Sequence, residues 1–302
     1  MNLSLTHAAR WPLALLAAAL LAACGDTAKY PIESGMGPDP KLPEPVKRVI
    51  PTVKVAPVKR WAANAKPVAA AGLQVNAFAR DLDHPRWIYV LPNGDVLVAE
   101  TNAPPGPPNE GGGGLRDKVM NSMMQKAGAR TPSANRITLL RDADGDGVAE
   151  TRTQFLSGLY SPFGMALVGD RFYVANADAL VSFPYKDGDT HISAPPSFVA
   201  NLPGGINHHW TKSLVASADG SRLYVGVGSN SNVAENGLDE ELNRAAILQI
   251  DPASGSTRVY ASGLRNPVGM AWAPGTDTLW VVVNERDELG SDLVPDYLTS
   301  VR

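Results

Sequence analysis

The sequence has a single cysteine and no excess of basic residues. One cysteine excludes a disulfide framework and any zinc or iron–sulfur site that needs several thiolates. Lys and Arg number 27 against 30 Asp and Glu, so the formal charge is −3, which argues against nucleic acid as a partner. Hydrophobic residues make up 44% of the 302, enough for a substantial core, while 28 glycines and 25 prolines indicate many turns and short strands.

Residues 1–24 are predicted to form a secretory leader. Its apolar run, Trp11–Cys24, has 14 residues and is shorter than the roughly 20 that span a bilayer. The run ends in Leu21-Ala22-Ala23-Cys24, which resembles a bacterial lipobox, so we expect the Cys24 thiol to carry diacylglycerol. An ordinary signal peptide with a chance cysteine is the alternative. The sequence thus predicts a lipid-anchored protein of the bacterial cell envelope that faces the periplasm.

Residues 25–71 are predicted to form a proline-rich linker. Prolines recur there without apolar periodicity, as in Gly37-Pro38-Asp39-Pro40, and this favours extended conformations. Such a linker would hold a globular domain, predicted over residues 72–302, away from the membrane surface.

Four later segments repeat one layout: a proline or aromatic entry, a short apolar stretch, a tight turn and a strand-like run. The strand-like runs are Val96–Glu100, Phe172–Asn176, Leu223–Val227 and Leu279–Glu285. Their central valines (Val98, Val174, Val225 and Val281) are 76, 51 and 56 residues apart. The two shorter spacings each fit a four-stranded propeller blade. Further strands are expected at 137–140 and 246–250, where each apolar run precedes a polar turn.

These repeats predict an all-β fold, a β-propeller of about four blades over residues 72–302. A β-sandwich with similar hairpins is the alternative. An insertion from Asn102 to about Ser133 explains the long first spacing, and its Met-rich stretch (Met120, Met123 and Met124) is expected to form a short helix. Since the length allows three blades and most of a fourth, we expect either a truncated propeller or an unusual four-bladed ring.

Polar residues end the strand-like runs. The inner strands of a propeller point toward one central funnel, so we expect these ends to converge there: Glu100, Asn176, residues 228–230 and residues 284–285.

Two of the five histidines, His208 and His209, are adjacent at the entry of the third repeat. Imidazole titrates near neutrality and is a candidate general base, with a structural histidine as the equal alternative. On a strand, adjacent side chains point to opposite faces, so only one of the two should face the funnel.

The fourth repeat adds a cation and an acidic loop. Arg265 offers a rigid, permanently charged fork for an anionic oxygen, or else forms an exposed salt bridge. The loop at 284–292 is rich in carboxylates that suit calcium, although a solvated loop fits equally well.

Asp142-Ala143-Asp144-Gly145-Asp146-Gly147 resembles the start of an EF-hand loop. Thr153 stands where such a loop needs a bidentate glutamate, so a hairpin turn is the favoured interpretation.

In their order and spacing, these segments resemble the glucose/sorbosone dehydrogenase family. The resemblance covers about residues 73–302 and is most specific at Asn207-His208-His209, at Leu264-Arg265-Asn266-Pro267 and in the acidic loop. The lipobox and the proline-rich segment are similar to the sorbosone dehydrogenase branch. The resemblance implies a six-bladed quinoprotein propeller that binds pyrroloquinoline quinone (PQQ) through calcium.

The resemblance also implies roles for individual residues. His209, with His208 as the fallback, would take a proton from a sugar hydroxyl. Arg265 would stabilise the developing quinone oxyanion, and Asn266 and Asn207 would help to bind the cofactor.

Calcium would be held by the loop at Asp287 and Glu288, where the family has Gly-Pro. The glutamine that relatives place in an early blade has no counterpart near residues 162–164, and the family's later blades do not occur before Arg302.

The predicted function is therefore oxidation of an aldose or sorbosone-like sugar by hydride transfer to PQQ. The electron acceptor, a cytochrome or the quinone pool, is left open. A calcium-dependent propeller lactonase and a non-catalytic propeller that binds a glycan or a protein are the two alternatives.

Overall fold

The structure, a computed structural model, describes residues 27–47, 55–59, 61–62, 65–106, 122–128 and 131–301. The predicted leader with Cys24 lies outside the described residues, as do Met120 and the glycines at 111–114. The chain divides into two compact units. The smaller unit comprises Met1–Lys54 and Glu285–Pro295, and the larger comprises Val55–Asn284 and Asp296–Arg302.

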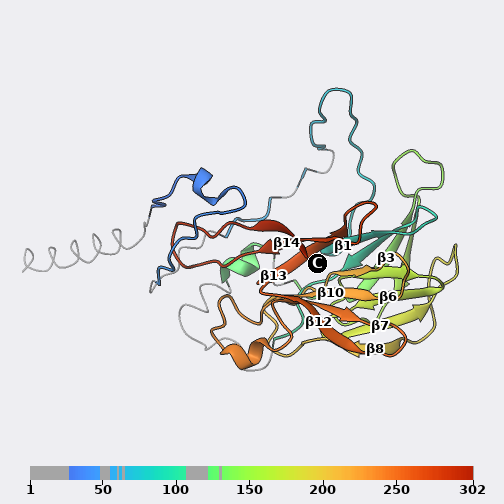
Figure 1. The fold of residues 1–302 in the computed structure, drawn as a ribbon. Coiled ribbons are helices and arrows are strands. Elements are labelled where there is room, and N and C mark those ends of the chain that lie inside the picture. The colour runs from blue at the N-terminus through green and yellow to red at the C-terminus, as the bar shows by residue number, and fades with distance from the viewer. Residues whose placement is uncertain are drawn as a thin grey trace, which may run out of the picture. The chain divides into compact units, whose positions relative to one another are not determined.

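The larger unit contains four antiparallel sheets, which are the blades of a β-propeller (Figure 1). Blade 1 consists of β1 (Pro85–Val90), β2 (Val96–Glu100), β3 (Arg136–Arg141) and β4 (Thr151–Leu156). Blade 2 consists of β5 (Met165–Val168), β6 (Arg171–Ala175), β7 (Ala179–Pro184) and β8 (Ser197–Asn201). Blade 3 consists of β9 (Leu214–Ala216), β10 (Leu223–Val227), β11 (Ala246–Ile250) and β12 (Thr257–Ser262). Blade 4 consists of β13 (Asn266–Trp272), β14 (Leu279–Asn284) and β15 (Tyr297–Val301). The predicted all-β propeller of about four blades is confirmed.

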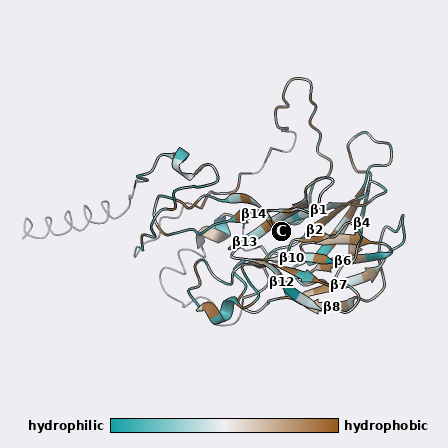
Figure 2. Ribbon diagram, in the orientation of Figure 1, coloured by the Kyte–Doolittle hydropathy of each residue, from teal (hydrophilic) through white to brown (hydrophobic). Residues whose placement is uncertain are grey.

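The core lies between successive blades. In blades 1 to 3 the middle strands are buried on both faces, which explains their continuous apolar runs such as Val96–Ala99, whereas β14 in blade 4 alternates between buried and exposed residues. Leu97 and Phe172 belong to a cluster shared by blades 1 and 2, and Leu180 and Leu223 to one shared by blades 2 and 3. Figure 2 shows hydrophobic residues recurring along these strands. Each side chain of this size contributes about 1.5–3 kcal/mol on full burial.

The first strands of the blades face one another. β5 contacts β9, and β9 contacts β13. Gly164 permits this approach, because an added Cβ would lie 2.5 Å from both the backbone nitrogen of Leu214 and the backbone oxygen of Lys212. Because adjacent strands are antiparallel, the entry to each first strand and the exit from the second strand lie at the same end of the blade.

Helical structure is sparse in the described residues. It consists of the 3-10 helices η1 (Ile32–Gly35) and η2 (Leu238–Glu241) and of a helical segment at 122–126, which confirms the short helix predicted for the Met-rich stretch. None of the helices that the structure describes combines the length and hydropathy required to cross a membrane.

Part of the predicted linker is hydrogen-bonded within the smaller unit. The backbone N–H groups of Lys29 and Tyr30 donate to Oδ1 of Asp292 at 2.7 and 2.9 Å. The backbone N–H of Val46 donates to the carbonyl of Leu289 at 2.9 Å. Residues 27–47 therefore contact the acidic loop at Leu289 and Asp292.

Candidate functional site

The two adjacent histidines lie in a turn that leads into β9. The prediction placed them on a strand, but the strand begins only at Leu214. The backbone N–H of His208 bonds to the carbonyl of Asn230, and the two imidazole rings meet edge to face with their centroids 4.7 Å apart. His208 is exposed and His209 is half-buried, so the two rings do occupy different environments.

The hydrogen bonds of His209 fix its tautomer. Nδ1 lies 2.9 Å from the carbonyl oxygen of Ser229, which only accepts, so Nδ1 carries the hydrogen. The Ser229 hydroxyl, 3.0 Å from Nδ1, donates to the carbonyl of Ser231 and therefore also acts as an acceptor toward the imidazole. Nε2 keeps its lone pair and has no hydrogen-bond partner among the described residues.

Burial, followed by the charge of Arg265 and the neighbouring His208, lowers the pKa of His209 from 6.5 to about 3. The hydrogen bond to the Ser229 carbonyl acts in the opposite direction but is outweighed. At neutral pH the imidazole is therefore uncharged, with its lone pair on Nε2.

Arg265, at the entry to β13, is joined to His209 through the loop at 228–232 that follows β10. Its Nε donates to the carbonyl of Asn232 at 2.8 Å and its Nη2 to Oδ1 of the same residue at 2.6 Å. Its carbonyl accepts the N–H of Ser229 at 2.8 Å. The structure thus brings together, around one loop, the histidine and the arginine that the sequence analysis singled out in separate repeats.

Asn266 completes this cluster beside Gly228. Oδ1 of Asn266 is buried and has no hydrogen-bond partner within the described part of the chain. An added Cβ on Gly228 would lie 2.5 Å from this oxygen and closer still to Cβ of His209. A glycine is required at 228 because the backbone passes directly against both side chains.

A row of aromatic rings joins the entries of the first three blades. Trp87 packs against Phe163 with centroids 4.9 Å apart, and Phe163 against Trp210 at 5.9 Å. The guanidinium of Arg86, from blade 1, lies 5.6 Å from the ring centroid of Trp210. Sequence reasoning did not assign Arg86 or Trp210 to the site, although Trp210 directly follows His209.

The side chain of Asn207 is taken up by protein partners. Its Oδ1 accepts hydrogen bonds from Lys212 Nζ and from Arg244 Nη1, both at 3.1 Å, and its Nδ2 donates to the carbonyl of Ala177 at 3.1 Å. These bonds tie the histidine turn to blade 2. Nothing in the sequence pattern indicated that Lys212 and Arg244 would be buried here.

Asp287 and Glu288 belong to the smaller unit, whereas His209, Arg265 and Asn266 belong to the larger one. Asp287 is exposed, and Glu288 has a φ of 66°, in the left-handed region. Their predicted role in holding calcium remains a prediction.

Glu100, expected at the funnel, instead centres a buried network in blade 1. Its carboxylate has no exposed surface and accepts hydrogen bonds from Arg136, from the Thr138 hydroxyl and from the backbone N–H of Asp83. Burial acts to raise the pKa of Glu100, but these hydrogen bonds outweigh it and lower the pKa.

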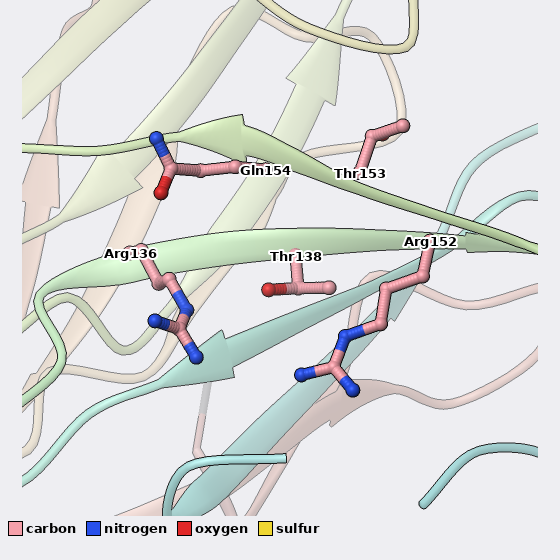
Figure 3. A pocket seen from close by; sticks show the side chains of 5 residues that line it. All are labelled: Arg136, Thr138, Arg152, Thr153 and Gln154. Carbon is pink, nitrogen blue, oxygen red and sulfur yellow. The ribbon is translucent and has the colours of Figure 1, made fainter. Parts of the chain in front are cut away.

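A cavity of about 220 Å³ adjoins this network. It is lined by Arg136, Thr138, Arg152, Thr153 and Gln154. Figure 3 shows the two guanidinium groups pointing to the same side, on either side of Thr138. Arg152 donates to the carbonyls of Arg80 and Asp81, and Arg136 binds Glu100, so both cations are engaged by protein oxygens.

The loop resembling an EF-hand joins β3 to β4, in agreement with the hairpin interpretation. Oxygen atoms of Asp142, Asp144, Asp146 and Glu150 lie within 4.8 Å of one another. The Asp142 carboxylate accepts the N–H groups of Gly145 and Gly147, and Glu150 accepts that of Ala143. The fourth acid of this group is Glu150, at the ninth position of the loop, whereas the twelfth position, where an EF-hand has its bidentate glutamate, is Thr153.

The solved structures similar to this chain include sugar-oxidising propellers. The holo form of the pyranose dehydrogenase PQQ domain from Coprinopsis cinerea is 18% identical with a TM-score of 0.51, and the match covers 70% of this chain and 46% of that one. The iodide structure of a family AA12 carbohydrate-active enzyme from Trichoderma reesei is 17% identical with a TM-score of 0.60, covering 81% and 58% of the two chains. The calcium structure of the same enzyme is 17% identical with a TM-score of 0.59, covering 78% and 56%.

The chain therefore spans about half the length of these structures, and at these identities the likeness shows the propeller fold. The comparison with curated proteins finds no match. The family model described as TrAA12-like matches residues 133–295. These findings bear out the resemblance to the glucose/sorbosone dehydrogenase family. Since the matched residues make up more than half of the sequence, the chain belongs to the TrAA12-like family.

Proposed function

We propose that this chain carries the proton-accepting and quinone-orienting part of a PQQ-dependent dehydrogenase that oxidises an aldose or a sorbosone-like sugar. One observation carries the proposal: the loop at 228–232 joins an uncharged imidazole, His209, to a permanent cation, Arg265. The family match and the similar structures support the class of reaction.

The residues of this cluster fit an anionic, planar quinone. Asn266 presents a buried oxygen for which the described residues supply no hydrogen-bond partner, so a ligand that donates an N–H or O–H to it would be favoured. The backbone at Gly228 packs directly against His209 and Asn266 and so keeps these two side chains next to each other. Arg265 and Arg86 supply positive charge for carboxylate or quinone oxygens. PQQ, when bound, supplies the hydride acceptor that no side chain offers.

The chain's own residues would then handle the proton. Nε2 of His209 accepts the hydroxyl proton of the sugar, because Nδ1–H is held by the Ser229 carbonyl and cannot exchange roles with Nε2. The resulting imidazolium lies near the positive charge of Arg265. Repulsion between the two charges disfavours the protonated histidine and favours release of the proton after the reaction. The Arg265 guanidinium, held at Nε and Nη2 by Asn232, stays in place to stabilise negative charge on an oxygen.

Four further assignments complete the proposal. Calcium would be held by the loop at Asp287 and Glu288. Cys24 would carry the lipid that anchors the protein in the bacterial envelope, facing the periplasm. Electrons would leave to a cytochrome or to the quinone pool. Nucleic acid is not among the partners, in keeping with the net charge of −3.

Titration of the chain with PQQ in the presence of Ca²⁺, followed by quenching of tryptophan fluorescence, tests the proposal. Saturable binding is expected for the wild type, and Arg265→Gln should weaken it at least tenfold. Arg258→Gln, at an exposed arginine of β12, is the matched control and should bind like the wild type. Sugar-dependent dye reduction by the loaded protein then identifies the reaction. An absence of binding, or equal binding by Arg265→Gln, would overturn the proposal and favour a lactonase or a binding propeller.

A further inference from the structure

Lys212 is a buried cation two residues before β9 and three residues after His209. Its side chain has no exposed surface. Nζ donates to Oδ1 of Asn207 at 3.1 Å and to the carbonyl of Trp210 at 3.0 Å. In the described part of the chain it forms no ion pair with a carboxylate. A buried ammonium without a counter-ion is costly, so its presence needs an explanation other than stability.

The two acceptors of Lys212 lie on either side of the histidines. Asn207 precedes them and Trp210 follows them, so one ammonium closes the turn at both ends. Opening that turn would swing the His209 imidazole away from the carbonyl of Ser229, which fixes its tautomer. We propose that Lys212 is a positioning residue for His209, acting through the Asn207 amide and the Trp210 carbonyl. The inference rests on the proposed function, because it assigns His209 the role of proton acceptor.

The charge of Lys212 has a second effect on His209, because it helps to keep the imidazole uncharged. Lys212 is among the groups that lower the pKa of His209, after burial, Arg265 and His208. The pKa of Lys212 is itself lowered from 10.5 to about 7, first by burial and then by Arg244, with Asp178 acting in the opposite direction. The lysine is therefore protonated below about pH 7 and loses its charge above it.

Arg244 provides a matched comparison. It donates to the same Oδ1 of Asn207, also at 3.1 Å, and to the carbonyls of Gly204 and Ile206. Among the described residues it makes no bond to the Trp210 carbonyl, and Lys212, not Arg244, is one of the main groups that lower the pKa of His209. Removing either cation loosens Asn207, but only the removal of Lys212 releases the far end of the turn.

The experiment follows the imidazole nitrogens of His209 by NMR in the cofactor-free chain. Lys212→Met is expected to change the single Nδ1–H tautomer into a mixture and to raise the pKa of His209. Arg244→Met should have a clearly smaller effect on both, and Lys212→Arg should restore the wild-type signals at least in part. Equal effects of Lys212→Met and Arg244→Met, or no effect of Lys212→Met, would overturn the proposal.

A second measurement needs no variant. In the wild type, the His209 ring signals should show an inflection at the same pH at which the Lys212 side chain titrates. The absence of this inflection would overturn the proposal, even if the Lys212→Met variant failed to fold. Because both measurements use the chain without PQQ or sugar, their failure is distinguishable from failure of the proposed function.

Discussion

Gly228→Ala is predicted to damage the site through a single added methyl group. The new Cβ would lie 2.5 Å from Oδ1 of Asn266 and closer still to Cβ of His209, whereas carbon atoms in contact are normally about 3.5–4.0 Å apart. Cβ of His209 is fixed to the backbone, so this contact is relieved only if the loop at 228–232 or the histidine turn moves by about 1 Å. Overpacking of this kind costs about 1–3 kcal/mol.

Gly269→Ala is the matched control. Gly269 lies in β13, and an added Cβ there would meet only Val282, with Cγ2 at 3.7 Å and Cβ at 3.8 Å, which are ordinary van der Waals contacts. Neither Gly228 nor Gly269 has a positive φ, so backbone strain does not separate the two variants. The comparison therefore isolates the contact with His209 and Asn266.

Urea unfolding and thermal melting measure the effect. The free energy of unfolding of Gly228→Ala should fall by about 1–3 kcal/mol, and its Tm by about 2–10 °C for a domain of this size. Gly269→Ala should lie within about 1 kcal/mol of the wild type. Gly228→Ala should also bind PQQ more weakly than Gly269→Ala. Equal stability and equal binding of the two variants would refute the close approach on which the site depends.

Three further predictions concern charge. Arg265→Gln should raise the pKa of His209, because it removes the largest charge effect on the imidazole; an unchanged NMR titration would contradict this. Glu100→Gln leaves buried donors without their carboxylate and should cost about 3–5 kcal/mol in urea unfolding, whereas a loss below about 1 kcal/mol would show that the network is dispensable. The hydrogen bond from Arg141 lowers the pKa of Asp95 in the folded protein. The ionised carboxylate therefore stabilises the fold at pH values above its unfolded-state pKa, and this stabilisation is lost as the pH falls through the folded-state pKa. In Asp95→Asn the free energy of unfolding should therefore decrease less steeply below about pH 4 than in the wild type. An identical pH dependence in this range would argue against the ion pair.

The blades were predictable because each is a local unit. A tight turn between two apolar runs specifies a hairpin, and the spacing of the hairpins specifies the blade. The strands at 137–140 and 246–250 were found in this way and correspond to β3 and β11. His209 and Arg265 were found because both stand at the entry to a blade, where the topology alone brings residues together.

The remaining features depend on contacts between distant segments. The burial of Lys212 and Arg244 follows from packing between blades, and each reads in the sequence as an ordinary surface cation. The bond from Lys29 to Asp292 joins residues 263 positions apart, so no local pattern announces it. The turn at His208 and His209 was mistaken for strand because its apolar neighbours, Trp210 and Leu214, fit either conformation.

The central claim is that His209 and Arg265 serve one ligand, and NMR titration of the chain with PQQ and Ca²⁺ tests it most directly. The imidazole signals of His209 and the Nε–H signal of Arg265 should shift together and saturate at the same PQQ concentration. Movement of only one of the two, or of neither, would contradict the account.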